Sequence, residues 1–224
     1  MRKYRVCLLL VPVLLIALFC LREAYVGLVS PTFHAIYYEA LLGDDERSVS
    51  ILVEALADRR EVVRSVVVSQ LAKRDCLDQL MERGLSNSNA ATREGAASVL
   101  VLMSPWVVVP KDKEQELRTE LRRNMQDADP LVRVQSARAC WAIFRDKSVL
   151  DVYIDTFGQL DLTGAKDRRT CYQLFNGIWE MRSDGRPATD FLQEQTKSGD
   201  RVVQSWAQSA LKGIEDPKVE FFGD

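Results

Sequence analysis

The stretch that decides the fold is DADPLVRVQSARACWAIF, residues 127–144. Asp129 can accept a hydrogen bond from the free N–H groups at the start of a helix, and Pro130 then falls at the first helical position, where proline is well tolerated. Small and apolar side chains follow from Val132 to Cys140. The stretch therefore predicts a helix that begins at Pro130 and buries one face.

The same frame occurs at 57–74, 87–103 and 198–214, with a weaker copy around Arg168. A long polar residue occupies one column of this frame, in steps of 29, 40, 35 and 36 residues. The first copy has Arg60 at the position of the helix cap, and we expect the side chain of Asp58 to cap the helix in its place. The polar column is Arg64, Arg93, Arg133, Arg168 and Gln204; the residues six positions earlier are Asp58, Asn87, Asp127 and Ser198; the expected caps are Asn89, Asp129, Gly164 and Asp200.

A shorter amphipathic segment precedes each copy. One such segment cannot bury its apolar stripe alone, and neither can a single pair of helices, so about five pairs must stack over residues 44–216. The predicted fold class is therefore all-α, an α-solenoid of helix pairs. The stripe Val63, Val67 and Leu71, with its equivalents, should face the first helices. The expected first helices are 46–57, 76–85, 112–126, 147–160 and 188–197.

The pattern resembles HEAT repeats, especially the short HEAT-like repeats of bacterial proteins. The resemblance covers about three quarters of the chain, and residues 160–190 are the least regular part of this region. The resemblance implies a right-handed solenoid in which Arg64, Arg93 and Arg133 satisfy the turn and the carboxylates of the neighbouring repeat. The residues that carry the resemblance are Asp127, Val132, Arg133, Ala137 and Cys140, and then Asp58, Val63, Arg64, Val68 and Leu71.

The amino terminus combines a basic stub with an uncharged run, VCLLLVPVLLIALFCL (6–21). Because no A-x-A cleavage site follows it, residues 1–22 are interpreted as an uncleaved signal anchor, and 23–43 as a juxtamembrane helix. A cleaved signal, which would give a secreted protein, and a buried core helix are the alternatives. The positive-inside rule puts the stub in the cytoplasm and the solenoid outside it, in a single-pass topology. Residues 217–224 form a tail.

Composition argues against most catalytic and nucleic-acid functions. Residues 1–22 hold four basic residues and no acid, so the rest of the chain has 26 basic and 32 acidic residues, a net charge of −6. An acidic domain has no electrostatic reason to bind DNA or RNA. His34 is the single histidine, and the cysteines form no metal-ligand pattern. We therefore expect no catalytic residue, metal or cofactor, and a protein that is not an enzyme.

The function that the sequence favours is a scaffold that binds a protein partner on the concave face of the solenoid. Its candidate binding residues are the polar ones on the second helices: Gln135, Arg138, Ser205 and Gln208. Trp106, in a loop between two prolines, is a separate candidate contact. A small-ligand-holding protein or enzyme of the phycobilisome-lyase kind is the alternative, and a DNA-handling solenoid is disfavoured by charge. The partner and the oligomeric state stay open.

Overall fold

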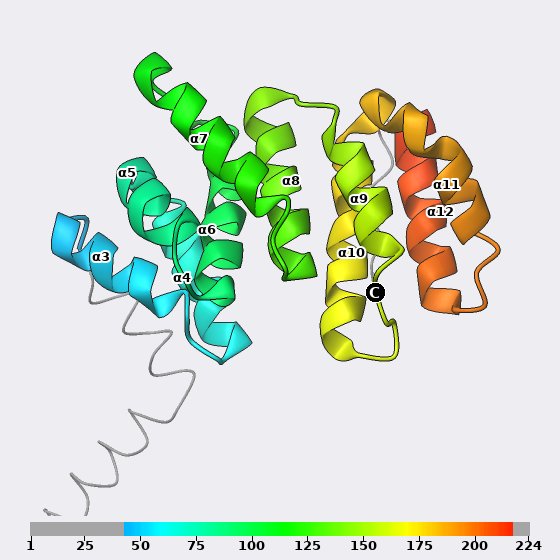
Figure 1. Cartoon of the computed structure of the whole chain (residues 1–224), viewed down its shortest axis with the longest axis horizontal. Helices are drawn as coiled ribbons and strands as arrows, with labels where there is room; N and C mark the ends of the chain where they lie inside the picture. The colour runs from blue at the N-terminus through cyan, green and yellow to red at the C-terminus, as the bar shows by residue number, and fades with distance from the viewer. Residues whose placement is uncertain (1–42, 217–224) are drawn as a thin grey trace, which may run out of the picture.

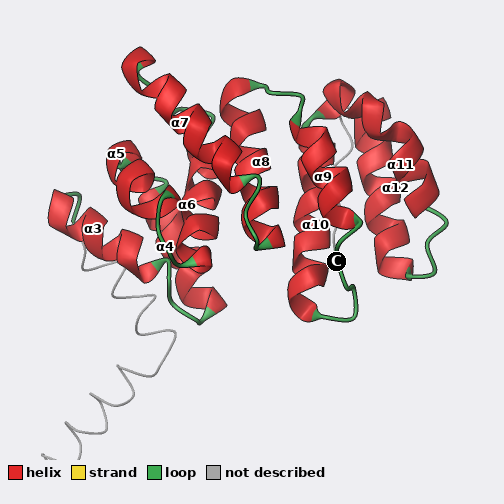
Figure 2. Ribbon diagram, in the orientation of Figure 1, coloured by secondary structure: helices red, strands yellow, loops and turns green. Residues whose placement is uncertain are grey.

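The computed structural model describes residues 43–216, and every regular element in this range is helical (Figures 1 and 2). The helices follow one another in pairs along a single row (Figure 1). The first pair is α3 (Glu46–Ala55) and α4 (Glu61–Leu71). The remaining elements are α5 (Leu77–Gln79), η1 (Leu80–Leu85), α6 (Ala90–Met103), α7 (Lys111–Asn124), α8 (Pro130–Phe144), α9 (Val149–Phe157), α10 (Ala165–Glu180), η2 (Arg182–Ala188), α11 (Thr189–Gln195) and α12 (Arg201–Glu215).

The second helix of each pair packs against its own first helix and against the second helices of the neighbouring pairs. Contacts run from α4 to α6, then to α8, α10 and α12. The apolar stripes close this core as the periodicity predicts, because Val63, Val67 and Leu71 are fully buried. Trp206 and Ile214 of α12 are buried as well. The second helices therefore form one continuous layer, with the first helices packed on one side of it.

The predicted helix caps are present in three of the pairs. The side chains of Asn89, Asp129 and Asp200 each accept a backbone N–H from the first turn of α6, α8 and α12. The expectation for the first copy is wrong in detail. Arg60 provides no side-chain cap to α4, and Asp58 accepts the N–H of Arg60 itself at 2.8 Å.

The first helices are less regular than the sequence suggests. The second one begins with a single α-helical turn and continues as the π-helical η1. The fifth consists of the 3₁₀ segment η2, which contains Pro187, followed by the short α11. The stretch 160–190 thus holds a continuous α10 and then this broken first helix. The anchor (1–22), most of the juxtamembrane segment (23–43), His34 and the tail (217–224) lie outside the described residues.

Candidate functional site

Arg64, Arg93 and Arg133 have structural partners at the turns within the helix pairs. In each copy of the repeat, the long polar side chain donates a hydrogen bond to the backbone carbonyl six residues earlier. These bonds are Arg64 to Asp58 (2.6 Å), Arg93 to Asn87 (2.7 Å), Arg133 to Asp127 (2.8 Å), Arg168 to Leu162 (2.8 Å) and Gln204 to Ser198 (2.5 Å).

Two of the four arginines in this column also bind an aspartate of the next helix pair. Arg93 forms a two-pronged bond to Asp127, with Nε–Oδ2 at 2.7 Å and Nη2–Oδ1 at 3.0 Å. Arg168 contacts Asp200 at 2.6 Å. Burial alone would raise the pKa of Asp127, but the hydrogen bonds from Arg93 and from the backbone N–H of Asp129, together with the positive charge of Arg93, outweigh it and the pKa is lowered. Arg133 uses neutral acceptors instead, the side chains of Thr156 and Gln159.

The exposed face of the second helices carries a groove made of two adjoining cavities of about 280 and 340 Å³. The two cavities share the side chains of four residues from α4, α6 and α10. We call these two cavities the groove. The shared residues are Glu61, Arg64, Glu94 and Arg169; further lining comes from Ser65, Val68, Ser69, Ser98, Val101, Leu102, Gln135, Arg138 and Gln173 in one cavity.

Arg169 shows that the face bearing the groove is concave. It reaches from α10 to Glu94 on α6, 3.2 Å away, and to Glu61 on α4, 3.5 Å away. Packed helices lie about 8–10 Å apart, so in a straight row α4 and α10 would be about 27 Å from each other. Two side chains cannot span that distance. The row of second helices therefore curves toward this face.

The floor of the groove holds buried ionisable groups. Glu94 is buried, and this burial raises the pKa of its carboxyl group although Arg169 and Arg64 partly oppose the shift. The Nε of Arg64 is buried with no hydrogen-bond partner. A buried donor without a partner is costly, and an acceptor supplied by a bound molecule would satisfy it. Together with Val68, Leu102 and the serines of its lining, the groove offers apolar, hydroxyl and cationic contacts side by side.

The structure places Gln135 and Arg138 in this groove, but not as freely exposed side chains. Gln135 is only 3% exposed and Arg138 only 8%, so these two candidate residues offer a bound molecule little accessible surface. Arg138 is held by Glu180, with Nε–Oε2 at 3.1 Å. Ser205 and Gln208 are exposed on α12, and neither belongs to the lining of the groove.

The sequence reasoning missed Glu94 and Arg169, the two residues at the centre of the groove. Arg169 belongs to a run of charges, Lys166 to Arg169, and such runs are typical of a solvent-exposed face. Glu94 directly follows the repeat arginine Arg93 and interrupts an otherwise small and apolar helix face. An acidic residue among small ones was the available signal in the sequence, but only the fold brings Glu94 to its partner Arg169, 75 positions away.

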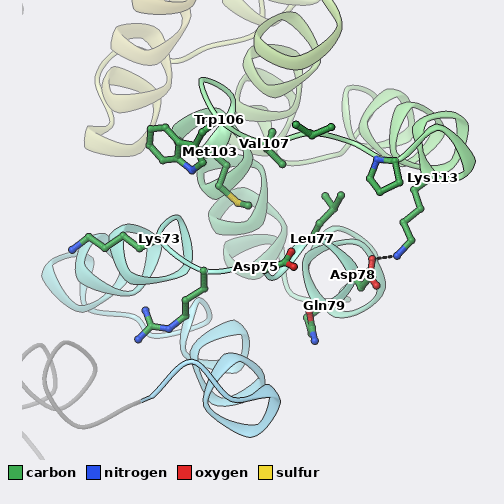
Figure 3. Close-up of a pocket in the computed structure, with 12 residues that line it drawn as sticks. Lys73, Asp75, Leu77, Asp78, Gln79, Met103, Trp106, Val107 and Lys113 are labelled. Atoms are coloured by element: carbon green, nitrogen blue, oxygen red, sulfur yellow. Dashed lines mark hydrogen bonds and ion pairs between the residues drawn. The ribbon is translucent and has the colours of Figure 1, made fainter.

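A third cavity, separate from the groove and of about 660 Å³, lies between the α4–α5 and α6–α7 connections. Figure 3 shows Trp106 beside Met103, with Lys73 below them and Leu77 on the side toward Lys113. Lys113 of α7 bonds to Asp78 of α5 along its wall. Trp106 is 61% exposed, so the structure places this candidate contact on an accessible loop, away from the groove.

Within residues 43–216, no group of three or more His, Cys, Asp or Glu side chains could hold a metal ion. The three cysteines of this range are free and buried. Burial raises the pKa of Cys140 to about 11 and those of Cys76 and Cys171 to about 12, which disfavours the reactive thiolate. No helix in this part of the chain has the length and apolarity needed to cross a bilayer.

Comparison with known proteins gives no relative: no protein-family model, no curated protein and no solved structure matches this chain.

Proposed function

We propose that this chain is a membrane-anchored α-solenoid of HEAT-like repeats that acts as a scaffold and binds a protein partner in the groove. The repeat type is supported by the bond from the polar column to the carbonyl six residues earlier, which recurs in all five pairs. The attachment is supported by the basic stub and the apolar run 6–21, with the solenoid on the extracytoplasmic side.

The observation that carries the binding proposal is the composition of the groove. Leu102 is an exposed large hydrophobic residue on α6, and it lies among the hydroxyl groups of Ser65 and Ser69 and beside the charged cluster of Glu94 and Arg169. An exposed apolar side chain surrounded by polar groups is typical of the centre of a protein interface. Because polar groups dominate the rim, we expect moderate affinity with selectivity from charge complementarity.

Site-specific photocrosslinking in native membranes tests this proposal. A photoreactive amino acid at Ser69 or Leu102 should give a discrete adduct with one partner, and the same group at the exposed Glu116 of α7 should not. The change Leu102→Glu should reduce the adduct formed from Ser69 at least several-fold without altering thermal unfolding. Equal crosslinking from Glu116, or an adduct unaffected by Leu102→Glu, would show that the groove is not the binding face.

A further inference from the structure

The α6–α7 connection exposes an apolar loop. Residues 105–110 read PWVVVP, and we call them the apolar loop. Trp106 is 61% exposed and Val108 is 86% exposed, among the four large hydrophobic side chains that the described residues leave in solvent. Surface hydrophobics gathered in one short segment indicate an interaction site more strongly than scattered ones do.

The apolar loop is held in place at both ends. The backbone N–H groups of Trp106 and Val107 both donate to the carbonyl of Met103, at 2.9 and 2.8 Å. The carbonyl of Pro110 accepts from Lys113 and Glu114 at the start of α7. Two prolines further restrict the backbone. The exposed side chains are thus presented by an ordered segment, so contact with a surface costs little conformational entropy.

The apolar loop lies on the same cavity as Arg74, which binds Gly43, the first described residue. The carbonyl of Gly43 accepts a hydrogen bond from Arg74 at 3.3 Å, and Arg74 lines the same cavity as Trp106. Twenty-one residues (22–42) separate the apolar run from Gly43. Fully extended, they span at most about 70 Å, so a bilayer that holds residues 6–21 lies within reach of the loop.

We propose that the apolar loop inserts Trp106 and Val108 into the interface of the bilayer that holds residues 6–21. The indole ring suits the headgroup level, and a protruding valine suits the adjoining acyl region. Lys73 and Lys111 can extend toward lipid phosphates, while Asp75 and Asp112 balance their charge. The contact therefore depends on apolar side chains and forms on zwitterionic phosphatidylcholine. It rests on the proposed membrane attachment.

Quenching of tryptophan emission tests the contact in the full chain. The chain is reconstituted into vesicles of phosphatidylcholine or of phosphatidylcholine brominated near the headgroup end of its acyl chains. All four tryptophans fall within the described residues, and Trp141 and Trp206 are buried. Brominated lipid should remove up to roughly a quarter of the emission, the share of one residue in four. Trp106→Phe should abolish this loss, and Val108→Asp should reduce it at least two-fold.

Val62→Asp is the matched control, because Val62 is 60% exposed but lies in the first turn of α4, at the opposite end of that helix from Arg74. It should leave the quenching unchanged. A chain that floats with the vesicles but shows no quenching, or quenching that persists in Trp106→Phe, overturns the loop contact and leaves the attachment standing. A chain that does not float with the vesicles overturns both. Loss of a crosslinked protein in Trp106→Phe without lipid quenching would assign the loop to a protein partner instead.

Discussion

Replacing Arg93 with alanine should destabilise the fold more than the same change at Arg133. Both arginines donate to a carbonyl six residues earlier, but only Arg93 also binds a carboxylate, that of Asp127. The Arg93 and Asp127 side chains are 16% and 10% exposed. Breaking a fully buried ion pair costs about 3–5 kcal/mol, and breaking an exposed one at most about 1 kcal/mol. We expect about 2–4 kcal/mol for Arg93→Ala and about 1–3 kcal/mol for Arg133→Ala.

Urea unfolding followed by far-UV circular dichroism measures both losses in the free energy of unfolding. Arg122→Ala is a useful control, because Arg122 also binds an aspartate, Asp146, at 2.8 Å but is 55% exposed. Its cost should stay below about 1 kcal/mol. A double-mutant cycle with Asp127→Asn should give a coupling energy of about 1–3 kcal/mol. If Arg93→Ala costs no more than Arg133→Ala, or the coupling is near zero, the ion pair does not hold the second and third pairs together.

Two further predictions concern the buried acid and a close helix contact. Burial raises the pKa of Glu94 above its ordinary value of 4.5, so ionisation of this carboxyl group opposes folding. Its contribution to the free energy of unfolding is present at low pH and is lost as the pH rises through the raised pKa. Glu94→Gln should flatten this part of the curve of unfolding free energy against pH, and an unchanged curve would contradict the prediction. Gly177→Ala should lower the free energy of unfolding by about 1–3 kcal/mol, because the added methyl group would lie 2.7 Å from the hydroxyl of the buried Tyr153. Gly199→Ala should be neutral in the same thermal or urea unfolding experiment, because its methyl group would meet nothing within 4 Å. Equal effects at both glycines would show that packing at Gly177 is looser than the structure indicates.

The second helices could be predicted from the sequence because their signals are local. The caps at Asn89 and Asp129 precede their helices directly, and the column of Arg93 and Arg133 lies at a fixed offset from them. Each signal depends on residues within one turn or one helix. The first helices were placed less well, since an amphipathic pattern does not distinguish α-helical from π-helical or 3₁₀ bonding, as in 80–85 and 182–188.

A concave face was expected from the stacking of helix pairs, but the contacts that line the groove could not be predicted, because they join different pairs. The repeat frame puts Gln135 and Arg138 on the side of α8 away from the first helices, and both line the groove. Arg138 binds Glu180 of the adjacent α10, and the curvature of the row joins Arg169 to Glu94 across 75 positions. No spacing within one repeat contains that information.

The bond between Arg169 and Glu94 has a consequence for the order in which the protein unfolds. In a linear array each repeat contacts only its neighbours, so the array can fray from either end one unit at a time. Here α10 of the fourth pair is tied to α6 of the second, with the third pair enclosed between them. Loss of the second pair must break this long-range tie as well as the contacts with its neighbours. The middle of the chain is therefore expected to melt as one cooperative block, and fraying is expected to begin at the fifth pair, because Arg169 also contacts Glu61 of the first pair.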